Sequence, residues 1–340
     1  MIRFALVVAS TLGFFLTAAI GNLMVPLLRA LSRPHQEGQK EPVQPGPGWS
    51  PREHGVPTLG GLCFMTGTLA AVGMGWTVVC LLQPELLGDG SQMTTRLLLM
   101  LGGAFAFGAV GLADDLARLR PPQILGLRTG TRLALELAAA VGVVLALYTS
   151  EYLPTGWAWP GLGYLELGAG AGPVWAALLV ALAESARCLN GPDGVCSGAA
   201  FVAMLGLMST MTLLGYFPLA VLPAALAGAL MAFLLWNFPP ARLLPGMTGC
   251  LFLAGGVGCV PLAIGRPALI LALGLPFFAA GALELAQTLW RRLAHKALFP
   301  VWPLERWLER RGLRPETVFC LFCGLAVCGL VLAMQLARLG

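Results

Sequence analysis

Ten apolar runs, separated by short polar segments, leave this chain few folds that it can adopt. A helix needs about 20 apolar residues to cross the hydrocarbon core of a bilayer. Runs near that length cover residues 5–28, 59–82, 97–113, 133–149, 174–186, 199–216, 219–236, 249–264, 267–289 and 318–336. Only 11% of the 340 residues are charged, against about 25% in a soluble domain. The sequence therefore predicts an all-α polytopic membrane protein, with about ten transmembrane helices in a single domain over 1–340.

Lys and Arg residues divide unevenly between the two sets of alternate loops. Of the 21, 17 fall in or next to loops at about 30–57, 114–131, 187–198, 237–248 and 290–316. The four on the other side are Arg3, Arg96, Arg266 and Arg338. Cytoplasmic loops carry the excess of positive charge in membrane proteins. We therefore expect these loops in the cytoplasm and both termini outside. The net charge of +5 is then explained by topology and contact with membrane lipids, with no nucleic-acid partner.

Two adjacent carboxylates, Asp114 and Asp115, end the third apolar run. Neighbouring carboxylates repel each other and are costly near a bilayer, so such a pair indicates a site for a metal, a proton or a phosphate. A solvated helix end is the plain alternative. Arg118 and Arg132 follow, and their guanidinium groups could bind phosphate oxygens; orientation of the chain in the membrane accounts for some of these arginines equally well.

Three further loops on the same side carry residues suited to binding. Asn190 and Asp193 lie in a Gly-rich segment and could supply oxygen ligands, although tight turns use the same residue types. Asn237 and Gly246 bracket a Gly- and Pro-rich segment in which backbone N–H groups could approach a phosphate. Segment 301–312, which includes Arg306, predicts a short amphipathic helix at the membrane interface.

In order and spacing, these segments resemble the motifs of one enzyme family, the polyprenyl-phosphate N-acetylhexosamine-1-phosphate transferases, and most closely the phospho-N-acetylmuramoyl-pentapeptide transferases. Segments 46–47 and 55–61 match its GP…GTPTMGG stretch, 111–115 matches GFxDD, 126–127 its following GL, 190–194 matches NLTDG, 237–249 matches N..PA…GDTG, and 303–312 matches PIHHHxExKG. The resemblance covers nearly the whole chain, from Gly46 to Glu316.

The resemblance implies a reaction and roles for the residues. A UDP-amino-sugar donates its sugar-1-phosphate to undecaprenyl phosphate at the inner leaflet of a bacterial cytoplasmic membrane, with Mg²⁺ as cofactor, in cell-wall glycan synthesis. By position, the catalytic residues are Asp114, Asp115 and Asp193, with Asp115 and Asp193 as metal ligands; the substrate-binding residues are Asn190, Arg118, Arg132, Asn237, Gly246 and Arg306. Small-residue runs at 102–104 and 224–229 permit close helix packing within one chain or between the two of a homodimer.

Several positions depart from the family pattern. Met247 stands where a metal-binding aspartate is expected, and a thioether is a poor ligand for Mg²⁺. Cys250 and Cys196 replace a serine and a second aspartate, and residues 305–307 read Glu-Arg-Trp in place of three histidines. Glu305 is a candidate substitute ligand. The alternative function is therefore a catalytically impaired paralogue that binds polyprenyl phosphate or an envelope-synthesis partner.

A transporter is a weaker third hypothesis, because no span carries an isolated pair of charges at the membrane midplane. Glu136 and Glu284 are the only candidates. Glu136 lies near a cytoplasmic end, and Glu284 is alternatively the partner of an arginine or lysine in a loop.

Overall fold

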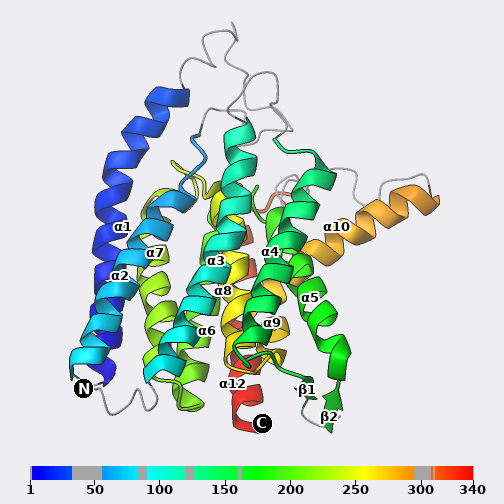
Figure 1. Cartoon of the computed structure of the whole chain (residues 1–340). Coiled ribbons are helices and arrows are strands. Elements are labelled where there is room, and N and C mark those ends of the chain that lie inside the picture. The colour runs from blue at the N-terminus through cyan, green and yellow to red at the C-terminus, as the bar shows by residue number, and fades with distance from the viewer. Residues whose placement is uncertain are drawn as a thin grey trace, which may run out of the picture.

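The computed structural model describes residues 2–32, 56–82, 90–118, 126–159, 163–191, 193–294, 308 and 311–339. They form a bundle of helices with a small hairpin at one end (Figure 1). The long helices are α1 (Ile2–Ser32), α2 (Gly61–Leu82), α3 (Gly90–Arg118), α4 (Thr129–Thr149), α5 (Ala171–Cys188), α6 (Val195–Leu213), α7 (Val221–Asn237), α8 (Gly246–Ala263), α10 (Leu275–Ala294) and α12 (Pro315–Leu339). Nine helices in the described ranges are long and apolar enough to cross a membrane. The prediction of an all-α polytopic membrane protein is confirmed.

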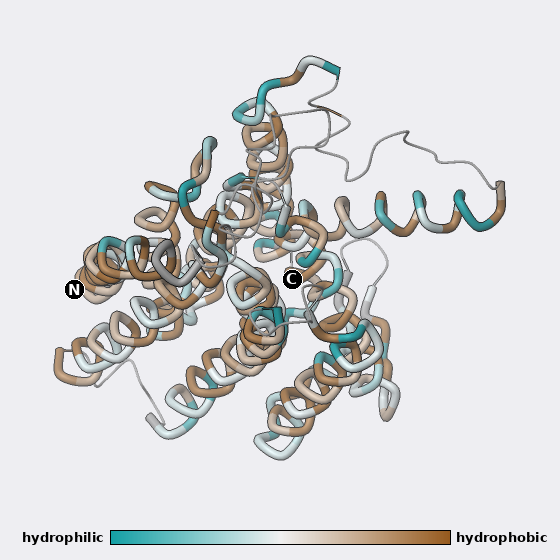
Figure 2. Tube along the Cα trace, turned by 90° about the horizontal axis from the view of Figure 1, so that it is seen from above, coloured by the Kyte–Doolittle hydropathy of each residue, from teal (hydrophilic) through white to brown (hydrophobic). Residues whose placement is uncertain are grey.

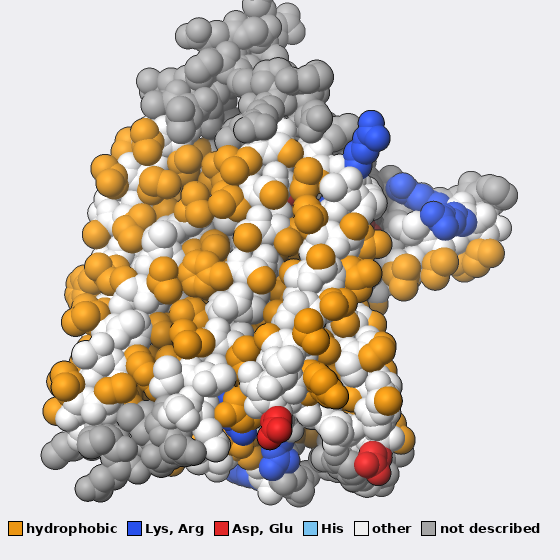
Figure 3. All heavy atoms as spheres, in the orientation of Figure 1, with side chains coloured by type: hydrophobic (Ala, Val, Ile, Leu, Met, Phe, Trp, Pro, Cys, Tyr) orange, Lys and Arg blue, Asp and Glu red, His pale blue; other side chains and the backbone are white. Residues whose placement is uncertain are grey.

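The ninth expected span, 267–289, is not one helix. The chain forms the six-residue α9 (Ala268–Leu273), breaks at Gly274, and continues as α10. Pro276 explains the break, because proline lacks an N–H and disfavours helical geometry at the residue before it. After the break α10 leaves the bundle sideways (Figures 1 and 2); we call residues 275–294 the arm. Hydrophobic side chains line one edge of the arm, and the side chains of its two arginines, Arg291 and Arg292, lie on the other (Figure 3).

The loop between α4 and α5 contains strands that the sequence did not predict. Strands β1 (Gly156–Trp159) and β2 (Gly163–Glu166) pair antiparallel, with Trp157 opposite Leu165. The indole N–H of Trp175 donates to the carbonyl of Pro154 at 2.7 Å, and the rings of Trp157 and Trp175 lie 5.7 Å apart. The hairpin is thus fixed to the first turns of α5.

Helix α8 lies at the centre of the bundle, and all of its 18 residues are buried. It packs along α3 and also contacts α2, α5 and α6. A Cβ at Gly255 would lie 2.8 Å from the Cα of Ala104, so the two backbones approach closely. Gly228 of the 224–229 run lies against the backbone of Ser10 in α1. Both predicted small-residue runs therefore contribute to packing within the chain.

The described helix ends that flank the expected cation-rich loops lie at one end of the bundle. Helices α3, α5 and α7 end there, and α4, α6 and α8 begin there, while α1 begins and α12 ends at the opposite end (Figure 1). Between the two ends the surface is largely hydrophobic (Figure 3), with exposed Leu98, Val141 and Leu145 among its residues. The chain is a multi-pass membrane protein, and the assignment of the loop end to the cytoplasm stays a prediction.

Candidate functional site

Asp115 caps the N-terminus of the central helix. Its Oδ1 accepts the N–H of Met247 at 3.1 Å, and its Oδ2 accepts the N–H and the hydroxyl of Thr248 at 2.8 and 2.7 Å. The first N–H groups of a helix have no partner within the helix and favour a negative charge. Asp115 is 2% exposed. The predicted catalytic carboxylate of α3 therefore holds the start of α8 in place.

The start of α8 is shaped to receive this carboxylate. Gly246 has φ +70°, and a Cβ there would lie 2.5 Å from Oδ2 of Asp115. The preceding residues pair with the segment before α2: the N–H of Leu244 donates to Pro57, and those of Gly60 and Gly61 donate to Leu244 and Pro245, at 2.9–3.0 Å. Two motifs far apart in sequence are thus joined through their backbones.

Asp114 fixes the chain between α3 and α4. Its Oδ2 lies 2.7 Å from Nη2 of Arg118, and its Oδ1 accepts the N–H of Leu127 at 2.9 Å. Asp114 is fully buried. Both aspartates of the pair thus have charge-compensating or hydrogen-bonding partners on each oxygen.

Asp193 differs from the Asp114–Asp115 pair. Its Oδ2 accepts the N–H of Ala241 at 2.8 Å, but its Oδ1 is buried and has no hydrogen-bond partner. Burial raises the pKa of Asp193 above its usual range, and the hydrogen bond from Ala241 opposes that shift in part. Asp193 and Asp115 hold opposite ends of segment 241–247, so the loop after α7 connects the two. Asp193 is therefore the one predicted site carboxylate, within the described residues, with an oxygen that has no hydrogen-bond partner; we call this buried oxygen open in that sense.

Asn237 shapes the same loop from inside. Its Nδ2 donates to the carbonyl of Leu243 at 2.9 Å, and its Oδ1 accepts the hydroxyl of Ser197. Asn190 is 3% exposed, and its N–H donates to the carbonyl of Arg187 at 3.1 Å. The two predicted asparagines are thus buried parts of the loop framework beside Asp193.

The two arginines predicted to bind phosphate are paired with carboxylates. Arg118 binds Asp114, and Arg132 lies 3.1 Å from Glu184, in a different group of charges from the Asp pair. Arg128 and Arg242 are exposed, and neither side chain has an ion pair or hydrogen bond with the described residues. Arg242 directly follows Ala241, whose N–H donates to Asp193, so the backbone of this exposed arginine lies next to that hydrogen bond. The remaining predicted residue, Arg306, lies outside the described residues, as do Glu305 and the predicted 301–307 part of the interfacial helix.

The donor set that the described residues bring together does not fit the expected Mg²⁺ site. Mg²⁺ favours an octahedron of oxygen ligands. Both oxygens of Asp115 already accept protein donors, those of Asp114 face Arg118 and Leu127, and Met247, 1% exposed, offers no hard oxygen from its side chain. No three His, Cys, Asp or Glu side chains gather as metal ligands within the described ranges. Mg²⁺ dependence stays a prediction.

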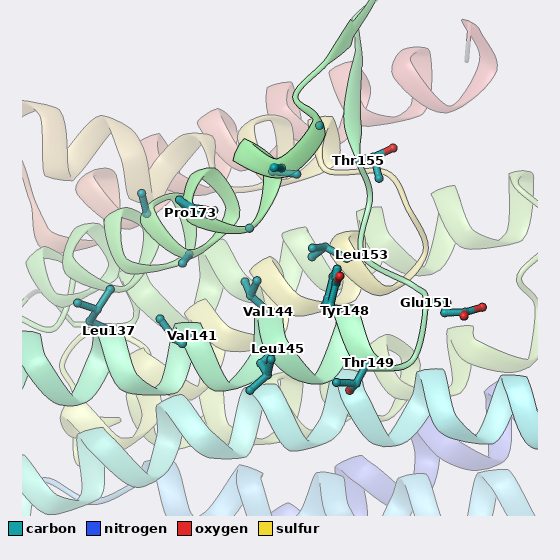
Figure 4. Close-up of a pocket in the computed structure, with 16 residues that line it drawn as sticks. Leu137, Val141, Val144, Leu145, Tyr148, Thr149, Glu151, Leu153, Thr155 and Pro173 are labelled. Carbon is teal, nitrogen blue, oxygen red and sulfur yellow. The ribbon is translucent and has the colours of Figure 1, made fainter.

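A cavity of about 1050 Å³ lies between α4 and α5, away from these carboxylates (Figure 4). Leu137, Val144 and Tyr148 of α4 line one wall, and Pro173 and Ala176 of α5 line the other. The cavity lies in the half of the bundle nearer the hairpin, where Glu151 and Thr155, after the end of α4, also line it.

Sequence reasoning missed the two hydroxyl groups that complete the site framework. Thr248 lies two residues into α8, and Ser197 lies in the first turn of α6. Serine and threonine near helix starts commonly bond to neighbouring polar groups. That signal was present in the sequence, but it does not reveal which distant carboxylate or amide is the partner.

Known proteins resemble this chain in sequence over most of its length. The model of glycosyl transferase family 4 matches residues 97–265, which include the Asp pair, the Asn190–Asp193 loop and α8. Proteins named phospho-N-acetylmuramoyl-pentapeptide-transferase align over almost the full length. The one from Heliobacterium modesticaldum is 30% identical over 98% of this chain and 97% of its own, and the one from Desulforudis audaxviator is 29% identical over 96% of each. The chain belongs to glycosyl transferase family 4, together with the phospho-N-acetylmuramoyl-pentapeptide-transferases.

Proposed function

We propose that this protein transfers an N-acetylhexosamine-1-phosphate unit from a UDP-sugar to undecaprenyl phosphate in cell-wall glycan synthesis. The observation that carries the proposal is the open Oδ1 of Asp193, held beside the loop after α7 by the N–H of Ala241. The near-full-length similarity to phospho-N-acetylmuramoyl-pentapeptide-transferases supports the reaction class.

In this proposal Asp193 acts on the lipid phosphate. Its Oδ1 takes the proton of a singly protonated phosphate monoester, and the freed oxygen forms a bond to the phosphorus that carries the sugar. The bond from that phosphorus to the bridging oxygen breaks, and UMP leaves with that oxygen. A carboxylate whose pKa is raised by burial is better matched to this task than a solvated one. The products are a lipid-linked diphospho-sugar and UMP.

The other residues divide between framework and binding. Asp114, Asp115 and Asn237 fix the three loops around Asp193. The exposed guanidinium groups of Arg128 and Arg242 are suited to the phosphates of the donor, because each has free N–H donors. The apolar cavity between α4 and α5 (Figure 4) is suited to part of the prenyl chain.

UMP release tests the proposal. The purified protein in lipid nanodiscs is mixed with undecaprenyl phosphate and either UDP-N-acetylglucosamine or UDP-N-acetylmuramoyl-pentapeptide, with Mg²⁺ and with EDTA. We expect UMP release that falls by at least about 10²-fold in Asp193→Asn, the usual contribution of a general base. Glu316→Gln, which alters an exposed carboxylate at the same end of the bundle, serves as the matched control and retains activity. Equal rates in Asp193→Asn and wild type would refute the role of Asp193.

The burial of Met247 and the occupied oxygens of Asp115 favour a second candidate function. In that case the protein binds polyprenyl phosphate without turnover and regulates or assembles envelope-synthesis enzymes. It predicts saturable binding of undecaprenyl phosphate in native mass spectrometry, with no UMP release from either donor. UMP release above the background of empty nanodiscs, abolished by Asp193→Asn, excludes it.

A further inference from the structure

Five side chains of alternating charge connect α4, α5 and the arm. Glu136 and Arg132 lie in α4, Glu184 and Arg187 in α5, and Glu284 in the arm. Arg132 lies 3.5 Å from Glu136 and 3.1 Å from Glu184; Arg187 lies 2.9 Å from Glu184 and 3.1 Å from Glu284. We call these five residues the charge chain. The pairing of Glu284 with an arginine is the expected one, although Arg187 lies in the last turn of α5.

The charge chain is partly buried, and removal of its charged side chains from water costs free energy that close pairing must offset. The Glu136 side chain is fully buried and that of Arg132 is 9% exposed, while the other three are 27–29% exposed. Charges removed from water require close partners, and loss of one partner leaves the other uncompensated. Three carboxylates face two arginines, so each arginine is shared and the five act as one unit.

Arg187 joins the charge chain to the site loop. The carbonyl of Arg187 accepts the N–H of Asn190 at 3.1 Å, and Asp193 follows three residues later. The thiol of Cys188 donates to Glu284 and lies 3.3 Å from the carbonyl of Glu184. Glu184 and Glu284, which bind Arg187 and Cys188, thus fix the start of the loop that carries Asp193.

Glu284, the next member of the charge chain, lies in the arm, which leaves the bundle after the break at Gly274 (Figures 1 and 2). A Cβ at Gly281 would lie 2.8 Å from Cβ of Ser185, so the arm is pressed against α5 one turn before Glu284. Beyond Glu284 the arm exposes Leu285, Leu289 and Leu293. The Arg187–Glu284 pair is therefore the charged tether between the exposed arm and the site loop.

We propose that Arg187 and Glu284 are positioning residues: they hold the Asn190–Asp193 loop in its working geometry by clamping the end of α5 to the arm. Neither residue touches the reacting groups. The proposal rests on the proposed transfer reaction, because that reaction gives the position of Asp193 its importance. Misplacement of a reacting group by about 1 Å can cost about 10²-fold in rate.

Glu284→Gln tests the clamp, because it removes the charge and keeps the shape. We expect kcat for UMP release to fall by at least about tenfold with the KM for the donor within about twofold. Glu284→Asp, which keeps the charge, recovers part of the loss. In a cycle with Arg187→Gln, the double variant is no slower than the slower single variant, since one interaction is lost in all three. Arg292→Gln, an exposed position on the same arm, is the matched control with unchanged kinetics.

Amide hydrogen exchange provides a readout that does not need turnover. In Glu284→Gln, the amides of Leu189 and Asn190 and those of the arm exchange faster than in wild type, while those of α8 do not. Cys188→Ala, which removes a single donor to Glu284, gives a smaller change in the same direction and covers the case in which Glu284→Gln does not fold. Unchanged exchange at Leu189 and Asn190 in both variants overturns the clamp, even if the protein is active. If the wild-type protein releases no UMP but Glu284→Gln still speeds exchange at Leu189 and Asn190, the clamp is supported and only the transfer reaction is rejected.

Discussion

Replacement of Asp115 by asparagine separates a framework role from a chemical one. The asparagine side chain fits the same space, but one of its two terminal atoms becomes a hydrogen-bond donor. If that NH₂ takes the place of Oδ1, it faces the N–H of Met247; if it takes the place of Oδ2, it faces both donors of Thr248. In either case a buried donor loses its acceptor, at about 1–3 kcal/mol. The first orientation costs less.

The charge is lost as well. Hydrogen bonds to a charged group contribute about 1.5–3 kcal/mol, against about 1 kcal/mol between neutral groups, and a carboxylate at a helix N-terminus adds up to about 2 kcal/mol. Relief from burying an ionised group offsets part of this loss. The net expectation is a destabilisation of about 2–4 kcal/mol, or a fall in Tm of about 4–8 °C at about 2 °C per kcal/mol.

Thermal unfolding in detergent micelles measures the change. Thr248→Val removes the hydroxyl and leaves the N–H of that residue in place, so it costs about 1 kcal/mol and about a third of the Tm shift. If Asp115→Asn melts within about 1 °C of wild type, or if Thr248→Val shifts the Tm more than Asp115→Asn does, Asp115 does not hold α8 and the capping argument fails.

Three further substitutions give distinct outcomes in the same melting assay. Asp193→Asn is expected to raise Tm at pH 7, because burial raises the pKa of Asp193 and its ionised form therefore destabilises the fold. The protonated form, present below the pKa of the unfolded chain, carries no such cost, and the cost appears as pH rises through the folded pKa. The gain in Tm should therefore vanish in acid. Gly246→Ala lowers stability by about 1–2 kcal/mol from its positive φ alone, and a larger Tm loss is expected because its Cβ would meet Asp115. Met247→Asp adds a hard ligand, so millimolar Mg²⁺ should raise the Tm of this variant and leave that of wild type unchanged; stabilisation of wild type by Mg²⁺ would contradict the poor fit of its donor set.

Apolar run length and the uneven spread of cations were enough to predict the spans and the gathering of the polar loops at one end. Both depend on the bilayer, which acts on every residue in the same way whatever its neighbours. The exception was 267–289, where run length suggested one helix and Pro276 divides it.

The roles of the site residues depended on partners that local sequence cannot specify. Asp114, Asp115 and Asp193 have the same side chain and lie in similar motifs, yet the first two are occupied and the third keeps an open oxygen. The difference comes from which backbone N–H groups the folding of α7 and α8 brings near each one. In the same way, Arg132 reads as a phosphate ligand in sequence, but the fold places it between Glu136 and Glu184.

The complete burial of α8 constrains how this chain can be made. Chains emerge from the N-terminal end and domains generally form in that order, so α8 enters the membrane while much of what later surrounds it, including α9, α10 and α12, is still unmade. Helix α8 must therefore be stable first with lipid around part of its surface, and then with that surface packed against the later helices. Its sequence fits both, since it has a mean hydropathy of 1.6 and no charged side chain. Position 247 lies at the loop end of α8, and Asp115 belongs to the earlier-made α3, so the acceptor for the N–H groups of Met247 and Thr248 is already in place when α8 enters the membrane.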